Sequence, residues 1–278
     1  MTKSSISFSV VGIVASVLLL VAAPAFANHS WGNYHWARSA NPLSLSLGDN
    51  VTSAWDAYLS TASSDWNVSD VLDTAVLAGG TNGTRGRDTP KYCNPTKGLV
   101  EVCNSKYGSN GWLGVASIWI SGNHITQGTV KLNDTYFNTT KYNTSAWRNL
   151  VMCQEIGHTF GIDHQDEAFN NSNLGTCMDY TSAPAGGIYN GFDYGPSNEH
   201  PNAHDYDELG AIYAHLDSFN SSFTSLASRS ADRRANIDTS DAREWGREIR
   251  ASRDGRSILY ERDLGGGEKV LTFVTWAD

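Results

Sequence analysis

The chain lacks an excess of basic residues, long internal apolar runs and C-x-x-C pairs. It holds 20 lysines and arginines against 29 aspartates and glutamates, for a formal net charge of -9. An acidic chain is poorly suited to bind nucleic acid or an anionic membrane, so we expect neither partner. After the first 27 residues no apolar run reaches the roughly 20 residues that a membrane span needs. Without a C-x-x-C pair, a cysteine-rich zinc site is not expected.

The N-terminal residues 1–27 have the pattern of an export signal. Lys3 supplies a positive start, residues 10–23 form an apolar run, and residues 25–27 read A-F-A, a typical cleavage site. The alternative, an uncleaved anchor, accounts less well for that site. We therefore predict a secreted, extracellular chain that starts near Asn28 and has no membrane contact after cleavage. The remaining residues suffice for one sizeable core and an appendage.

The four cysteines are Cys93, Cys103, Cys153 and Cys177. An even number in an exported chain predicts disulfides, and four cysteines allow three pairings. Short sequence separations favour one bond between Cys93 and Cys103 and a second between Cys153 and Cys177.

Hydrophobic periodicity predicts a mixture of strands and helices. A first strand ends near residue 47, and Asp49 or Asn50 is expected to cap a helix that extends to Trp66. A second helix is capped by Asn143 or Thr144 and stopped by Gly161. The irregular stretch 161–200 precedes a last helix. The later strands are predicted at residues 71–78, 98–107, 112–120 and 128–134. The last helix is predicted at residues 204–218, and a C-terminal hairpin at residues 257–278.

The stretch "CQEIGHTFGIDH" places several polar residues on one side of the second helix. Residues four apart lie about 40° from each other around a helix axis, so Gln154 and His158 point the same way. Gln154 and His158 could therefore share one ion, and Glu155 lies close enough to reach a water bound to that ion without ligating it. Gly161 lets the chain turn, and His164 can then return as a third ligand. Three protein ligands and a water are typical of catalytic zinc.

This spacing alone is weak evidence, because Q-E-x-x-H arises by chance on ordinary helices. The additional G-x-x-H at the correct offset strengthens it. Met178 in "TCMDYTS" follows His164 by 14 residues and adds a second, independent signal.

On these residues the chain resembles the metzincin clan of zinc metallopeptidases, in particular its matrixin-like branch. Glu155, His158, Gly161, His164 and Met178 match the pattern H-E-x-x-H-x-x-G-x-x-H…Met, with glutamine in place of the first histidine. The order of predicted elements also matches, over roughly residues 31–217.

The resemblance implies an α+β fold. It has a twisted, mostly parallel sheet, an active-site helix, a second helix, and an irregular C-terminal subdomain with a Met-turn and a final helix. We expect a metallopeptidase domain over 28–217, a linker or loosely packed segment over 218–256, and an extra β-hairpin over 257–278. Strand 112–120 would be the edge strand that pairs with an extended substrate.

The resemblance also implies residue roles. His158 and His164 would bind Zn²⁺, and Glu155 would be the general base. Met178 would form the floor beneath the metal, and the proposed Cys153–Cys177 bond would tie the helix to the Met-turn. Tyr180 would stabilise the oxyanion during turnover. The alternative for Tyr180 is a structural tyrosine with a satisfied hydroxyl.

Gln154 departs from the family pattern, since an amide oxygen is a weaker zinc donor than imidazole. Three outcomes are open. Gln154 ligates zinc through its oxygen, or a carboxylate from Asp163 or from residues 164–167 takes its place, or the site holds no metal. We favour a functional metal site with Gln154 as a ligand, because the other motif residues are all present.

The other histidines have simpler interpretations. His124 is expected at the surface, although it could bind a structural ion. His204 and Asp205 are expected to cap the last helix or to hydrogen-bond locally. His29 and His35 have no partner at ligand spacing.

We therefore predict a secreted, monomeric zinc-dependent endopeptidase whose substrates are proteins or peptides. The alternative is a catalytically inactive, secreted binding module that keeps the cleft. A third hypothesis is a surface-associated protein whose C-terminal hairpin is the functional part.

Overall fold

The computed structural model describes residues 29–81, 89–222, 237–252 and 255–277. The predicted export signal therefore lies outside the described residues. Within these ranges, no helix has both the length and the apolar character needed to cross a membrane.

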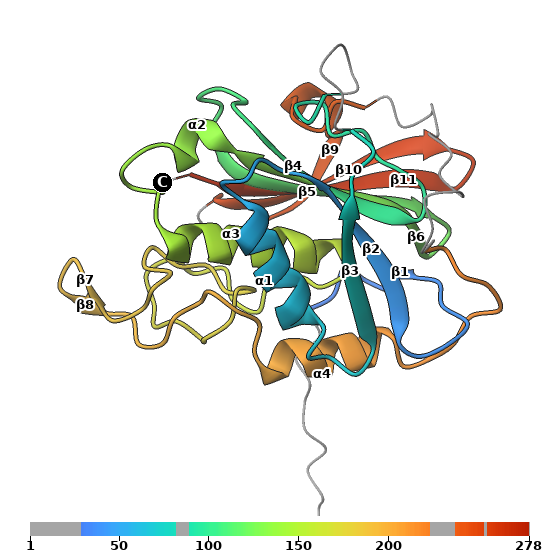
Figure 1. Ribbon diagram of the computed structural model, residues 1–278, viewed down its shortest axis with the longest axis horizontal. Coiled ribbons are helices and arrows are strands. Elements are labelled where there is room, and N and C mark those ends of the chain that lie inside the picture. The colour runs from blue at the N-terminus through green and yellow to red at the C-terminus, as the bar shows by residue number, and fades with distance from the viewer. Residues whose placement is uncertain (1–28, 82–88, 223–236, 253–254, 278) are drawn as a thin grey trace, which may run out of the picture.

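A single large sheet organises the molecule (Figure 1). Its strands lie in the order β3-β2-β4-β6-β5-β11-β10-β9, and β1 pairs with β6 beside this path. The strand bounds are β1 His35–Trp36, β2 Leu43–Asn50, β3 Leu72–Ala78, β4 Leu99–Ser105, β5 Trp112–Ser121, β6 His124–Asn133, β9 Arg247–Ala251, β10 Ser257–Gly265 and β11 Glu268–Trp276. A separate two-stranded hairpin consists of β7 Ile188–Tyr189 and β8 Phe192–Asp193.

The sheet is mixed rather than mostly parallel, and that part of the sequence prediction was wrong. Strands β1, β2, β3, β4 and β6 pair in parallel. Strand β5 is antiparallel to β6, and β9, β10 and β11 continue the antiparallel pairing. The difference arises because the C-terminal strands join the main sheet. A hairpin pattern in the sequence does not specify which other strand the hairpin will pair with.

The predicted strands over 71–78, 98–107, 112–120 and 128–134 are confirmed as β3, β4, β5 and β6. Strand β5, however, is not an edge strand. It lies between β6 and β11, with pairs running from Glu268 opposite Ser121 to Trp276 opposite Trp112. The expectation of a free edge at 112–120 is thus wrong for this conformation.

The C-terminal hairpin is confirmed as β10 and β11. In the described part of the segment before it, residues 242–244 form a 3₁₀ helix and β9 follows. Trp245 is buried with Trp112 and Val274, so one large aromatic residue anchors the segment against the sheet. That contact explains why a Ser-, Arg- and Asp-rich stretch is packed here.

The helices are α1 Asp56–Trp66, α2 Asp134–Phe137, α3 Ser145–Thr159 and α4 Ala203–Ile212. Helix α1 begins later than predicted, because Asn50 is the last residue of β2. Helix α3 begins as predicted, with the Thr144 hydroxyl accepting from the Trp147 amide at 3.2 Å. At the end of α3, Gly161 has a φ of +97°, which favours glycine. Asn202 caps α4, and Asp205 completes a capping box.

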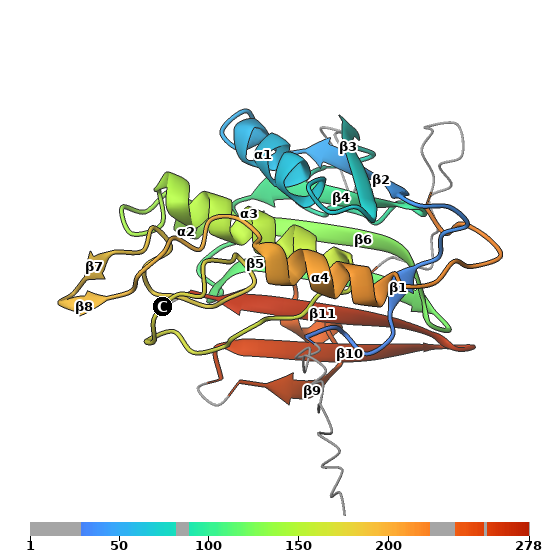
Figure 2. The same ribbon diagram turned by 90° about the horizontal axis from the view of Figure 1, so that it is seen from below.

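Helices α1, α3 and α4 lie on the same side of the sheet (Figure 2). Helix α3 packs on β5 and β6 and also against α1. Every residue of α3 from Leu150 to Thr159 is buried, so this helix has almost no solvent-facing side. Its polar residues must therefore find partners inside the protein.

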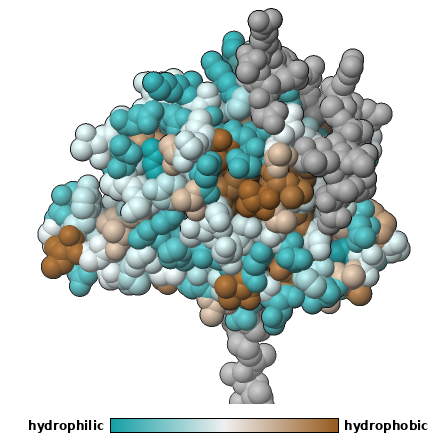
Figure 3. All heavy atoms as spheres, viewed as in Figure 1, coloured by the Kyte–Doolittle hydropathy of each residue, from teal (hydrophilic) through white to brown (hydrophobic). Residues whose placement is uncertain are grey.

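Both predicted disulfides are confirmed, between Cys93 and Cys103 and between Cys153 and Cys177. The face of the molecule drawn in Figure 3 is mainly hydrophilic, with small separate apolar groups. One of these groups lies at the β7–β8 hairpin, where Ile188 is 80% exposed.

Candidate metal centre and active site

Helix α3 carries three of the predicted site residues into the protein interior. Gln154, Glu155 and His158 are at most 1% exposed. The loop after Gly161 brings His164 to the same place, where its side chain is fully buried. The structure thus places Gln154, Glu155 and His158 on one buried helix and brings His164 next to His158.

Met178 packs directly beneath α3. A Cβ atom on Gly157 would lie 2.8 Å from the Met178 sulfur and 2.6 Å from the Trp66 ring. Only glycine leaves room for such a close approach. The Cys153–Cys177 disulfide holds the same two segments together, one residue from Met178.

The imidazoles of His158 and His164 face each other, with 3.0 Å between their Nε2 atoms. His158 Nδ1 donates to the Ile162 carbonyl at 2.8 Å, which leaves its Nε2 atom as the unprotonated nitrogen. Burial lowers the pKa of His158 well below its usual value and lowers the pKa of His164 to about 3. Both rings are therefore neutral at neutral pH, which is the form that binds metals.

Neither carboxylate oxygen of Glu155 forms a hydrogen bond of normal geometry among the described residues. Burial raises its pKa to about 8, although Thr275 and the Ala116 backbone oppose the shift. Gly114 on β5 provides the space, because a Cβ atom there would lie 2.3 Å from Glu155 Oε1. An unpartnered buried carboxyl group is costly, and such groups are typical of functional sites.

Tyr180 packs its ring against His164, with 4.2 Å between ring centroids. Its hydroxyl is buried and has no hydrogen-bond partner within the described ranges. The catalytic role of Tyr180 stays a prediction, because the side chains of Ser257 and Thr275 lie close enough to act on the pKa of this hydroxyl. Burial raises the pKa of Tyr180 well above its usual value, so the hydroxyl stays protonated and can donate.

Both the nitrogen and the oxygen of the Gln154 side-chain amide form hydrogen bonds within the protein. Its Nε2 atom donates to the Cys177 carbonyl at 2.9 Å, and its Oε1 atom accepts from the Thr275 hydroxyl at 3.0 Å. The first bond fixes which end of the amide is the oxygen. The oxygen is thus held by the C-terminal strand β11 in this conformation.

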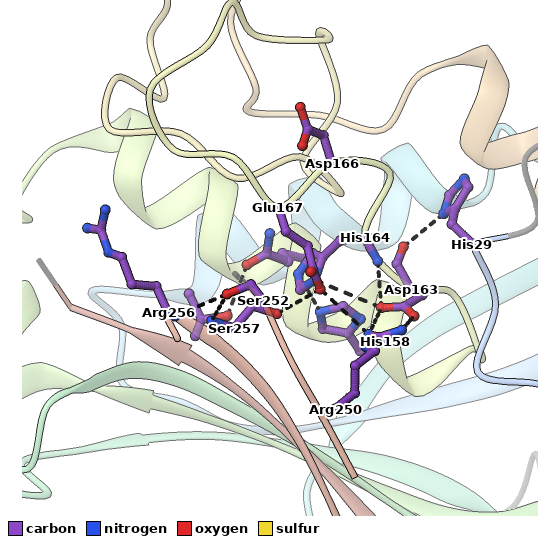
Figure 4. Close-up of polar contacts among 12 residues, drawn as sticks. His29, His158, Asp163, His164, Asp166, Glu167, Arg250, Ser252, Arg256 and Ser257 are labelled. Atoms are coloured by element: carbon purple, nitrogen blue, oxygen red, sulfur yellow. Dashed lines mark hydrogen bonds and ion pairs between the residues drawn. The ribbon is translucent and has the colours of Figure 1, made fainter. Parts of the chain in front are cut away.

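The carboxylates proposed as substitutes for Gln154 approach the other side of His164 (Figure 4). Asp163 and Glu167 lie 3.9 and 3.8 Å from His164 Nδ1, whereas Nε2 faces His158. Asp163 also forms an ion pair with Arg250, which lies 3.7 Å from Glu167. At these distances neither carboxylate hydrogen-bonds His164 Nδ1, which has no hydrogen-bond partner in the described residues, and both lie on the side of the ring away from His158.

Strand β11 covers the centre, which the sequence did not reveal. Phe273 stacks on His158 at 4.2 Å between ring centroids and contacts His164 at 4.5 Å. Thr275, two residues on, reaches the same side of the strand and bonds Gln154. In the sequence these residues read only as part of an apolar run, so no local signal could have found them.

The donor set fits a zinc ion. Tetrahedral zinc with bonds of about 2.0–2.1 Å to nitrogen separates its ligand nitrogens by about 3.3 Å. The 3.0 Å between the two Nε2 atoms is close to that separation. Glu155 lies three residues before His158 on α3, which puts both side chains on one face of the helix, and the Tyr180 ring packs against His164.

Comparisons with known proteins give weak likenesses. No protein-family model and no curated protein matches the chain. Among solved structures, myroilysin is 13% identical, with a TM-score of 0.37 over 66% of this chain and 84% of that one. A hatching enzyme zinc-protease from Oryzias latipes (medaka fish), high choriolytic enzyme 1, is 11% identical, with a TM-score of 0.34 over 65% and 94%. These values assign no family, so the residues themselves must support a function.

Gly114→Ala tests the packing between β5 and Glu155. The added methyl group would collide with the carboxyl group, so we expect a loss of roughly 1–3 kcal/mol in the free energy of unfolding, measured with urea. Gly210→Ala on α4 is the matched control, because no atom lies within 4 Å of the position that its added methyl group would take. The control should leave stability unchanged or raise it by up to about 1 kcal/mol. Equal effects of the two substitutions would contradict the packing.

Glu155→Gln tests the buried carboxyl group through the pH dependence of stability. In the unfolded chain the pKa is near 4.5, whereas burial raises it to about 8 in the folded chain. The wild type therefore loses stability as the pH rises from about 4.5 to 8, and the glutamine variant does not. In metal-free protein, we expect the variant to gain on the order of a few kcal/mol relative to wild type between pH 4.5 and pH 8. A stability difference that stays constant over this range would exclude the shift.

Proposed function

We propose that this protein is a secreted zinc-dependent endopeptidase. The observation that carries the proposal is the pair of neutral, facing imidazoles, with Glu155 on the same face of α3 as His158 and Tyr180 packed against His164. The resemblance to metzincin-type peptidases implies the same residues, with Gln154 where that pattern has a third histidine. His158 and His164 would hold the metal, with the Gln154 oxygen as third ligand.

Each residue would have a distinct task. Bound zinc would supply Lewis acidity that activates a water and polarises the substrate carbonyl. Glu155 would accept the proton of that water and pass it to the leaving amine. The Tyr180 hydroxyl would donate to the oxygen on which negative charge develops. The negative charge of Asp163 beside His164 would make that imidazole a stronger metal ligand.

An inactive binding module is the second candidate, and Gln154 is the observation that favours it. Both polar ends of this amide have partners within the protein, so it can be satisfied without a metal. A glutamine at this position also weakens zinc binding relative to histidine. Metal content separates the two functions.

The test is zinc content together with cleavage of a denatured protein substrate. We expect one zinc at the His158 and His164 centre, and we expect His158→Ala to remove it. Glu155→Ala should retain zinc and lose at least 100-fold in cleavage rate, since it removes the general base. Gln154→His should tighten zinc binding. A protein that binds no zinc through His158 and cleaves no substrate would rule out the peptidase.

A further inference from the structure

A second group of metal-binding side chains lies outside the candidate active site. His35 Nε2 lies 3.1 Å from His215 Nε2, and His124 Nε2 lies 3.1 Å from Asp217 Oδ1. Asp217 also approaches His35 at 3.6 Å and His215 at 3.7 Å. Two imidazole nitrogens and a carboxylate, from His35, His215 and Asp217, therefore lie close enough together to share one ion, and His124 bonds the same carboxylate.

The separations match a shared ion. Ligand atoms of tetrahedral zinc lie about 3.3 Å apart, and the separations among His35, His215 and Asp217 run from 3.1 to 3.7 Å. Two histidines with one aspartate, and a water in the fourth position, form a ligand set that suits zinc among the divalent transition metals. A surface cluster of carboxylates would have suited calcium or magnesium instead.

The fold holds these ligands in place before any ion binds. His35 opens β1 and His124 opens β6, and the two residues are opposite each other in the parallel pairing. His35 Nδ1 bonds the Asn33 carbonyl at 2.7 Å, which leaves Nε2 for the ion. The Arg38 amide donates to Asp217 Oδ2 at 3.0 Å and so fixes the carboxylate.

The group is also accessible. The side chain of His215 is 55% exposed, whereas those of His35 and Asp217 are 7% and 10% exposed. A cavity of about 300 Å³ is lined by His35, His215 and Asn33. An ion can therefore enter from solvent, and a preformed buried side of the site can receive it.

We propose that His35, His215 and Asp217 form a second zinc site with a structural role, and that His124 orients the Asp217 carboxylate. The ion would clamp the start of β1 to the segment that follows α4. None of these side chains contacts His158 or His164 in the described hydrogen bonds and ion pairs, so the site is independent of the proposed catalytic centre.

The test is zinc per chain in the full protein after dialysis against buffered zinc. The variant His215→Ala/Asp217→Asn should hold one zinc fewer than wild type, whether wild type holds two or one. It should also lose the zinc-dependent rise in melting temperature, which we expect to be on the order of 5 °C. His200→Ala is the matched control, because His200 is a half-exposed histidine paired with Asp65 elsewhere.

The single variant Asp217→Asn shows whether a loss of zinc comes from misfolding. Its amide oxygen can still accept the hydrogen bond from the Arg38 amide, so we expect it to fold as wild type does. We expect it to weaken zinc binding by roughly tenfold or more while the circular dichroism spectrum stays unchanged. Equal zinc content in wild type and the double variant would overturn the site. If the peptidase proposal fails because His158 and His164 bind no zinc, the zinc content of wild type and of the double variant would fall by the same amount, and the difference between them would remain.

The C-terminal strand carries a second inference, which rests on the proposed function. Strand β11 pairs with β5 along its whole length, antiparallel, on the side where an extended substrate would pair. Phe273 covers both imidazoles, and Thr275 holds the Gln154 oxygen. Arg250 on β9 adds an ion pair to Asp163 beside the same centre.

We infer that β11 is an internal occupant of the substrate cleft, so that this conformation is a self-inhibited form. A peptide and β11 would compete for the same backbone groups of β5. Displacement of β11 would free the Gln154 oxygen and uncover His158 and His164 in one step.

The test uses the full chain with a recognition sequence for a site-specific protease inserted between Gly266 and Gly267, in the exposed turn between β10 and β11. Cutting the turn and removing the freed strand in dilute urea should raise substrate cleavage at least tenfold. Adding a synthetic peptide of residues 268–277 should reverse the gain. The same chain with Glu155→Gln should stay inactive throughout.

Hydrogen exchange at β5 separates the two ways in which this test can fail. Faster exchange of the β5 amides after strand removal, without any hydrolysis, would refute the peptidase and support β11 as the occupant. Hydrolysis that is equal before and after strand removal would refute the self-inhibited form.

Discussion

The burial of helix α3 is the constraint on which the rest of the structure depends. Its residues from Leu150 to Thr159 have no exposed side, although Gln154, Glu155 and His158 are polar. Burying polar groups is tolerable only where partners are arranged for them. Gln154 and His158 receive such partners from Cys177, Thr275 and Ile162, whereas Glu155 does not.

That distribution of partners indicates which groups are arranged for chemistry. Residues that only stabilise a fold normally have their hydrogen bonds satisfied. Among the described residues, the atoms without a hydrogen bond of normal geometry include both oxygens of Glu155 and the hydroxyl of Tyr180, whose ring packs against His164. The free energy lost by leaving them unpaired is offset by tight packing of α3 against the sheet and the Met178 segment.

The C-terminal strands give the molecule two properties at once. Adding β11 to β5 removes an edge that would otherwise expose unpaired backbone groups, which stabilises the sheet. The same addition places Phe273 and Thr275 over the candidate centre. Stability of the sheet and access to the centre are therefore opposed, because both depend on the same row of backbone hydrogen bonds.

Local patterns in the sequence determined much of this protein. The helix with Gln154 and His158 on one side, the turn at Gly161, the strands β3 to β6 and both disulfides follow from spacing, periodicity and turn chemistry. These features depend on residues close together in the chain, where geometry is nearly fixed.

Only the tertiary structure decided what meets across long separations. His35, His124 and Asp217 have no shared motif, and they converge because β1 and β6 pair in parallel while the chain returns after α4. The placement of β11 beside β5 was equally hidden, since an apolar hairpin carries no mark of the strand it will join. Strand pairing is set by packing of whole faces, and a sequence pattern of period two specifies a face but not a partner.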